Sequence, residues 1–137
     1  MAALTSLRNT KSKAGDQRSF LIAANVKIYA GSIVVIEAGY AKPGKTATAL
    51  STVGIACQNY DNTGGAAGAF LVSVQTSGGD RDYLMANDTT APVVQTGVGF
   101  DCYVLDDQTV TSDATGRSVA GKALRLENGQ VWVRFPI

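Results

Sequence analysis

The sequence predicts an all-β fold, a compact small β-barrel or sandwich built from short strands. Runs rich in Val, Ile, Thr and aromatic residues alternate with Gly, Pro, Asn and Asp turn signals, which indicates about nine or ten short strands. No stretch carries the 3.6-residue apolar period of a long helix. The dipeptide Asn128-Gly129 is a strong hairpin signal, because both residues tolerate the positive φ of a type I′ turn.

The hairpin around this turn, Ser118 to Phe135, is predicted to close the fold. Its predicted register pairs Leu126 with Val131, Leu124 with Val133, Lys122 with Phe135 and, on the other face, Arg125 with Trp132. The last pair is a candidate cation–π contact. A slip of one residue would move every side chain to the opposite face, so the register is strongly specified.

Four further elements follow from local patterns. Residues 32–37 form a nearly continuous β-branched run, which predicts a strand buried on both faces. Ala38-Gly39 turns the chain into the next strand, and a single helical turn is expected within residues 87–99. Gly54 lies inside the strand predicted over residues 52–58, where it indicates a bulge or a close approach of another backbone.

The 137 residues divide into a flexible basic N-terminal arm, residues 1–18, and a single β domain, residues 19–137. The arm has four basic residues and one acidic residue, hence a charge of +3, whereas the remainder has eight basic and ten acidic residues, hence −2. We therefore expect Arg8, Lys11 and Lys13 to bind an acidic partner surface, and the alternative is a solvated N-terminus that binds no partner. No aromatic residues alternate with these basic ones, which argues against nucleic acid as the partner. No apolar run approaches the ~20 residues of a membrane span, which argues against a membrane partner.

Catalysis, metals and cofactors find little support in the sequence, so we expect no enzyme. The chain has no histidine, which removes the commonest general base and metal ligand. A carboxylate pair could come from Asp101, Asp106 or Asp107, but adjacent aspartates more often hold turns. The spaced oxygen ligands of a calcium loop are missing, both around residues 80–82 and around residues 106–107.

The Gly-rich loop and the two cysteines are also expected to have structural rather than chemical roles. The Gly-rich loop of residues 61–68 lacks the Gly-Lys-Ser/Thr ending of a phosphate-binding loop. Cys57 and Cys102 lie in apolar strand-like runs, so we expect both to be buried, reduced and unreactive, although a disulfide between them stays open.

Several segments, taken in order, are similar to a known family. They are Ile28-Tyr29-Ala30-Gly31-Ser32-Ile33-Val34-Val35, Gly39-Tyr40-Ala41-Lys42-Pro43-Gly44, Val53-Gly54-Ile55-Ala56, Asp61-Asn62-Thr63-Gly64-Gly65-Ala66, Cys102-Tyr103-Val104-Leu105-Asp106-Asp107-Gln108-Thr109-Val110, Arg117-Ser118-Val119-Ala120-Gly121 and Gly129-Gln130-Val131-Trp132-Val133-Arg134. Together they span most of residues 26–134, and the set resembles the small capsid cement (decoration) proteins of tailed bacteriophages.

This resemblance implies a β-tulip-like domain that is made in the host cytoplasm and docks on the outer surface of the virion. Its partner would be the major capsid protein, whose neighbouring subunits it would clamp, and a homotrimer is the favoured oligomer. The family has no catalytic residues to transfer. The basic arm lies outside the matching segments, and we expect it to become ordered by adding a strand to a capsid sheet.

Two other functions remain open. One is a head-fibre or tail-associated structural protein. The other is a carbohydrate-binding module, for which Trp132, Tyr103 and Tyr83 would have to form one coplanar platform.

Overall fold

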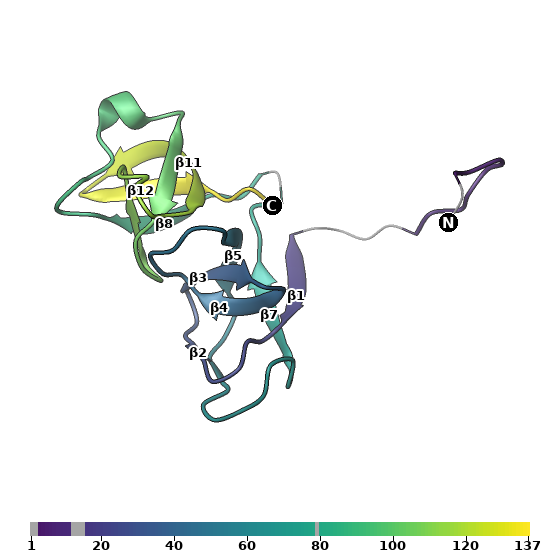
Figure 1. The fold of residues 1–137 in the computed structure, drawn as a ribbon. Coiled ribbons are helices and arrows are strands. Elements are labelled where there is room, and N and C mark those ends of the chain that lie inside the picture. Colours follow the sequence, from purple (N-terminus) through teal and green to yellow (C-terminus); the bar gives the residue numbers. More distant parts are fainter. Residues whose placement is uncertain (1–2, 12–15, 79) are drawn as a thin grey trace.

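The computed structural model describes residues 3–11, 16–78 and 80–137, and it confirms the all-β fold (Figure 1). The described strands are β1 (Gln17–Leu21), β2 (Lys27–Ile28), β3 (Ile33–Glu37), β4 (Tyr40–Pro43), β5 (Ser51–Ala56), β6 (Tyr60–Asp61), β7 (Leu71–Gln75), β8 (Tyr83–Asn87), β9 (Asp101–Val104), β10 (Thr109–Thr111), β11 (Val119–Glu127) and β12 (Gln130–Arg134). The single helical turn expected within residues 87–99 is the 3-10 helix η1 (Gln95–Gly97).

The strands form two main bodies that follow each other along the chain. The first half makes a five-stranded sheet of order β1-β7-β5-β3-β4, accompanied by the short pair β2-β6. The second half makes a closed barrel of order β10-β8-β12-β11-β9, in which β8 and β10 run parallel and the other neighbours antiparallel. Figure 1 shows the barrel and the sheet stacked against each other, with β3 and β5 nearest to the barrel.

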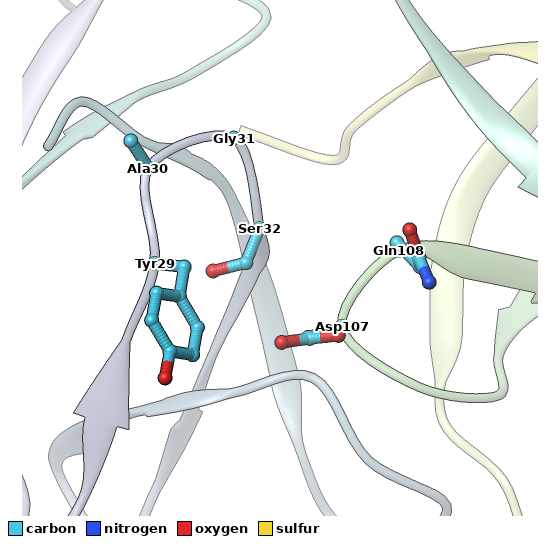
Figure 2. A pocket seen from close by; sticks show the side chains of 6 residues that line it. All are labelled: Tyr29, Ala30, Gly31, Ser32, Asp107 and Gln108. Carbon is cyan, nitrogen blue, oxygen red and sulfur yellow. The ribbon is translucent and has the colours of Figure 1, made fainter. Parts of the chain in front are cut away.

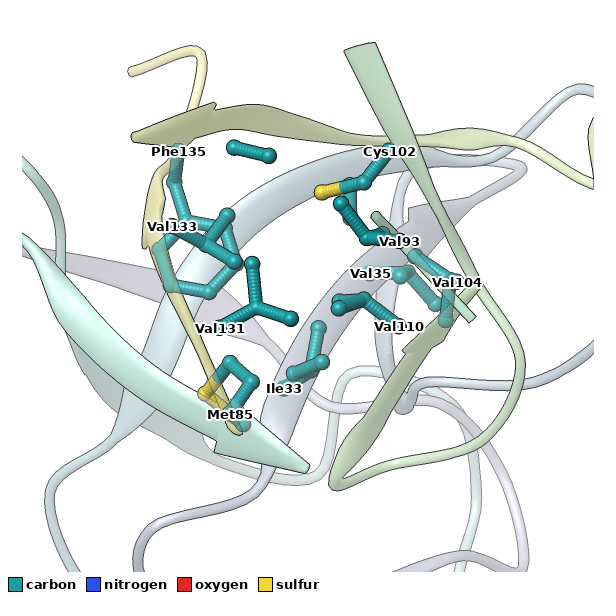
Figure 3. Packing of buried hydrophobic residues seen from close by; sticks show 12 residues of the cluster. Ile33, Val35, Met85, Val93, Cys102, Val104, Val110, Val131, Val133 and Phe135 are labelled. Atoms are coloured by element: carbon teal, nitrogen blue, oxygen red, sulfur yellow. The ribbon is translucent and has the colours of Figure 1, made fainter. Parts of the chain in front are cut away.

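Strand β3 is buried on both faces, as its β-branched run predicts. Ile33 and Val35 point into the barrel core, together with Met85, Val131 and Val133 (Figure 3). Val34 points the opposite way, into the core of the sheet, and Ile33, Val34 and Val35 are fully buried. Because side chains alternate along a strand, one short element supplies both cores.

The bend of the sheet beside β3 depends on Gly54. The register between β3 and β5 shifts between Val34, which pairs with Gly54, and Val35, which pairs with Thr52, so the bulge that the sequence indicated lies at Val53, directly beside this glycine. The φ of Gly54 is +150°, and a Cβ at this position would collide with the carbonyl oxygen of Gln75. Only a residue without a side chain allows β7 to approach so closely.

The closing hairpin corrects part of the predicted register. Leu126 pairs with Val131 and Arg125 with Trp132, as predicted, across the turn at Asn128 (φ 49°) and Gly129 (φ 76°). A bulge at Leu124 then shifts the ladder, so that Val133 pairs with Ala123 and Lys122 with Arg134. The predicted pairs Leu124–Val133 and Lys122–Phe135 are therefore wrong, and Leu124 is 36% exposed. A bulge adds one residue to one strand and increases its twist, which favours closure of a small barrel.

The boundary between arm and body also differs from the predicted one. Strand β1 begins at Gln17, which pairs with Gln75, and Arg18 pairs with Val74. The carbonyl oxygen of Asp16 accepts a hydrogen bond from the Thr76 amide. Gln17 and Arg18 thus belong to the sheet and Asp16 is bonded to it, whereas residues 3–11 are exposed and lie away from the body in Figure 1.

The contrast between two glycines gives a prediction. Gly54→Ala should lower the free energy of unfolding by roughly 2–6 kcal/mol, because it combines backbone strain with a clash against Gln75. Gly129→Ala meets nothing within 4 Å, so we expect only the strain of its positive φ, about 1 kcal/mol. Urea unfolding of both variants is the measurement, and equal losses would show that the close approach at Gly54 is unimportant.

Candidate binding surfaces

Within the basic arm, residues 3–11 are all exposed. Arg8 and Lys11 form no ion pair in the described part of the chain, and the Thr10 amide donates to the Arg8 carbonyl within the same segment. Lys13 lies outside the described residues. Arg8 and Lys11 are therefore free to meet an external partner.

The arm also carries two apolar side chains that the charge analysis did not single out. Leu4 is 73% exposed and Leu7 is 96% exposed. Large aliphatic side chains on a segment that contacts no core are candidates for burial against a partner. In the sequence, Leu4 and Leu7 stand out because most of the residues around them are small, polar or basic.

The three aromatic residues of the carbohydrate hypothesis do not share one surface. Tyr83 packs on the barrel core, with its ring 5.6 Å from that of Phe135 and its hydroxyl donating to the carbonyl of Thr76. Burial raises the pKa of Tyr83 above its ordinary value. Trp132 pairs with Leu84, the neighbour of Tyr83, and therefore points to the opposite face of the barrel wall. The proposed platform is not formed.

The Gly-rich loop has a structural role around Asn62, which is 5% exposed. Its side-chain amide donates to the carbonyls of Ala23 and Ala66. A Cβ at Gly65 would collide with the Asn62 side chain, so the glycine makes room for this buried amide.

The two cysteines differ in their environments. Both are free, but Cys57 is exposed at the end of β5, so the prediction that it is buried is wrong. It follows the last strand residue, Ala56, whose side chain points inward, and alternation places Cys57 outward. Cys102 is buried as expected, and burial raises the pKa of its thiol to about 12.

Three loop aspartates, Asp88, Asp106 and Asp113, accept backbone hydrogen bonds from residues close in sequence. Asp88 accepts from the amides of Thr90 and Ala91, and Asp113 accepts from the amide of Thr115. These backbone hydrogen bonds lower the pKa of both carboxyl groups. In the same way, Asp106 accepts from the amide of Gln108. No group of three acidic or cysteine side chains within the described ranges is arranged to hold a metal ion.

Asp107 is different, because its carboxylate has no hydrogen bond or ion pair with any described residue. It lines a pocket of about 390 Å³ at the junction of barrel and sheet, together with Tyr29, Ala30, Gly31, Ser32 and Gln108. Figure 2 shows the Asp107 carboxylate and the Ser32 hydroxyl directed toward the side on which the Tyr29 ring lies. The Tyr29 side of this pocket comes from the sheet half and the Asp107 side from the barrel half.

One of the side chains that line this pocket, Ser32, is a buried polar group without a hydrogen-bond partner among the described residues. Ser32 is 5% exposed, and its Oγ has no hydrogen-bond partner among the described residues. An unpartnered buried hydroxyl costs free energy, since it has lost its water and gained nothing in exchange. Such a group in a folded protein calls for a structural or functional explanation.

Comparisons with known proteins gave no match. No family model matches the chain, and no significant match was found among curated proteins or among solved structures. Within the part of the chain that the structure describes, no helix is both long and apolar enough to cross a membrane.

The cysteine environments predict one reactive thiol in the native protein. Cys57 should react with a thiol reagent within minutes, whereas Cys102 should react only after unfolding, because the thiolate is the nucleophile and burial suppresses it. Counting labelled thiols with and without denaturant is the measurement. The variant Cys57→Ser should show no native labelling, and labelling of this variant would contradict the burial of Cys102.

Ser32 predicts an unusual effect on stability. Ser32→Ala removes an unpartnered buried hydroxyl and should raise the free energy of unfolding by about 1 kcal/mol. The matched control is Ser118→Ala, because the Ser118 hydroxyl donates to the Ala47 carbonyl and accepts from the Leu50 amide. This second change should cost about 1–3 kcal/mol. A loss of stability in Ser32→Ala would show that its hydroxyl is satisfied in solution.

Proposed function

We propose that this protein is a structural capsid decoration protein, which binds the outer surface of a tailed-phage head and stabilises the shell by clamping neighbouring subunits of the major capsid protein. The resemblance of its ordered segments to the cement proteins motivates the proposal. The observation that supports it most is the fully exposed arm, with Arg8, Lys11, Leu4 and Leu7 free for a partner. A binding module of this kind needs a stable body and accessible contact residues, without reactive groups.

The proposed contact combines two physical terms. The basic side chains would form charge-assisted hydrogen bonds to acidic groups of the shell. Leu4 and Leu7 would gain apolar burial, which is worth about 1.5–3 kcal/mol for each side chain that becomes fully buried. Repeated on a lattice, modest contacts of each copy would sum to a stable assembly.

The same proposal places several copies of the chain on the shell, and a homotrimer is the favoured assembly. A head-fibre or tail-associated role would use the same arm, and binding to tails in place of heads would favour it.

The arm predicts separate effects on binding and stability. Deleting residues 1–11 should leave the melting temperature unchanged, because the described part of this segment is fully exposed, while capsid binding falls at least tenfold. Deleting residues 1–18 should also lower the melting temperature, because it removes Gln17 and Arg18 from β1. Co-sedimentation with tailed-phage capsids that lack their decoration protein measures binding, and thermal melts measure stability.

Charge variants test the electrostatic part. Changing Arg8, Lys11 and Lys13 to Ala should weaken binding more at low salt than at high salt, because salt already screens these contacts. Changing Lys27, Lys122 and Arg125 removes the same charge from the body and should have a smaller effect. Unchanged binding after deletion of residues 1–11 would contradict docking through the arm, and no binding of the full chain to any capsid would contradict the decoration function.

A further inference from the structure

We propose that the pocket between the two halves of the fold, lined by Tyr29, Ser32 and Asp107, is a binding site for the cationic end of a lysine or arginine side chain presented by a protein partner. This inference does not rest on the decoration function. It rests on three groups of complementary chemistry around one pocket of about 390 Å³. Figure 2 shows them together.

Each group matches one property of a basic side chain. The Asp107 carboxylate, which is only partly exposed and unpaired within the described residues, supplies the charge. The Ser32 hydroxyl, nine-tenths buried and unpartnered, supplies a further acceptor at the floor. The Tyr29 ring, 55% exposed, supplies an aromatic wall for the cation and its aliphatic stem.

The backbone around the pocket is fixed before any ligand arrives. The Ser32 amide donates to the Tyr29 carbonyl across a turn, and Gly31 takes the positive φ of 84° that such a turn requires at its third position. The Ala30 amide donates to Asn59 Oδ1 at 2.8 Å. On the other side, the Asp107 carbonyl accepts from the Ile33 amide at 2.7 Å. A prearranged site loses little entropy when it binds.

Charge complementarity favours a cation over an anion or a neutral ligand. The chain from residue 19 onward carries −2, and the ion pairs of the body use the basic residues Lys27, Lys42, Lys45, Arg117, Lys122, Arg125 and Arg134. None of these residues forms an ion pair with Asp107, and neither does Arg81, the remaining basic residue of the described body. A basic side chain must therefore come from outside the described body, either from the arm of a second copy or from another protein.

The test is an NMR titration of the full chain, which follows the amide signals of Gly31, Ser32 and Gln108. N-acetyl-arginine methylamide should shift them with a dissociation constant in the millimolar range. The citrulline analogue has the same shape without the charge and should bind at least fivefold more weakly. Equal binding of both probes, or no shift with either, would overturn the proposal.

Variants separate the site from a general charge effect. Asp107→Asn should weaken binding of the arginine probe at least fivefold, and Ser32→Ala should weaken it while the protein stays folded. Glu127→Gln removes the same charge from the distant hairpin and should leave the titration unchanged. If Asp107→Asn bound the arginine probe as well as the unchanged protein does, the Asp107 carboxylate would not be the group that attracts the cation.

A capped peptide of residues 3–11 identifies the source of the side chain. If it shifts the same amides more strongly than the arginine probe, and needs Asp107 to do so, the occupant is the arm of a second copy. If it binds no better than the probe, the occupant belongs to another protein. Both results keep the basic side chain as the ligand.

Discussion

The double burial of β3 is the constraint on which the rest of the structure depends. Ile33 and Val35 complete the barrel core, and Val34 completes the core of the sheet. A fully buried aliphatic side chain contributes about 1.5–3 kcal/mol, so three adjacent residues support both halves at once. Neither core is complete without this strand, which ties the stability of the barrel to that of the sheet.

Polar contacts reinforce the same junction. The Thr52 hydroxyl donates to the Val119 carbonyl, the Thr46 hydroxyl donates to the Leu105 carbonyl, and Ser118 bonds to the loop before β5. These are side chains of the first half that satisfy backbone groups of the second half, or the reverse. Buried backbone groups need such partners, because water cannot reach them. Directional hydrogen bonds therefore fix how the two halves meet, in addition to apolar packing. Residues from both halves line the Tyr29–Asp107 pocket.

The sequence predicted features that are local and missed those that depend on three-dimensional contacts. The strand of residues 32–37, the turn at Ala38-Gly39 and the special role of Gly54 follow from residue type and period. The bulge at Leu124 was missed, because the predicted register was continued without interruption from the turn, and the register shifts only where β11 pairs with β12 beyond Arg125. Cys57 was predicted to be buried because its run is apolar, but the strand ends one residue before it.

The same limit applies to the candidate binding surfaces. The charge of the arm was evident from Arg8 and Lys11, since charge needs no fold to be counted. The pocket was not evident, because Ser32 and Asp107 are separated by most of the chain and each has an ordinary structural reading. Only the fold shows that one has an orphan hydroxyl and the other a carboxylate without a partner.

Closure of the barrel limits the places at which another chain can add a strand to this protein. A closed barrel has no strand with unpaired backbone groups along its side, so it offers no template for another chain. In the sheet, β4 is partly covered by the segment after β1, where the Ala23 amide donates to the Ala41 carbonyl, and β4 ends at Pro43, which cannot donate. Strand β1, at the other end of the sheet order, is the one that the arm enters. Within the barrel and the five-stranded sheet, the addition of a strand from another chain would therefore be confined to β1, the end of the sheet that the arm enters.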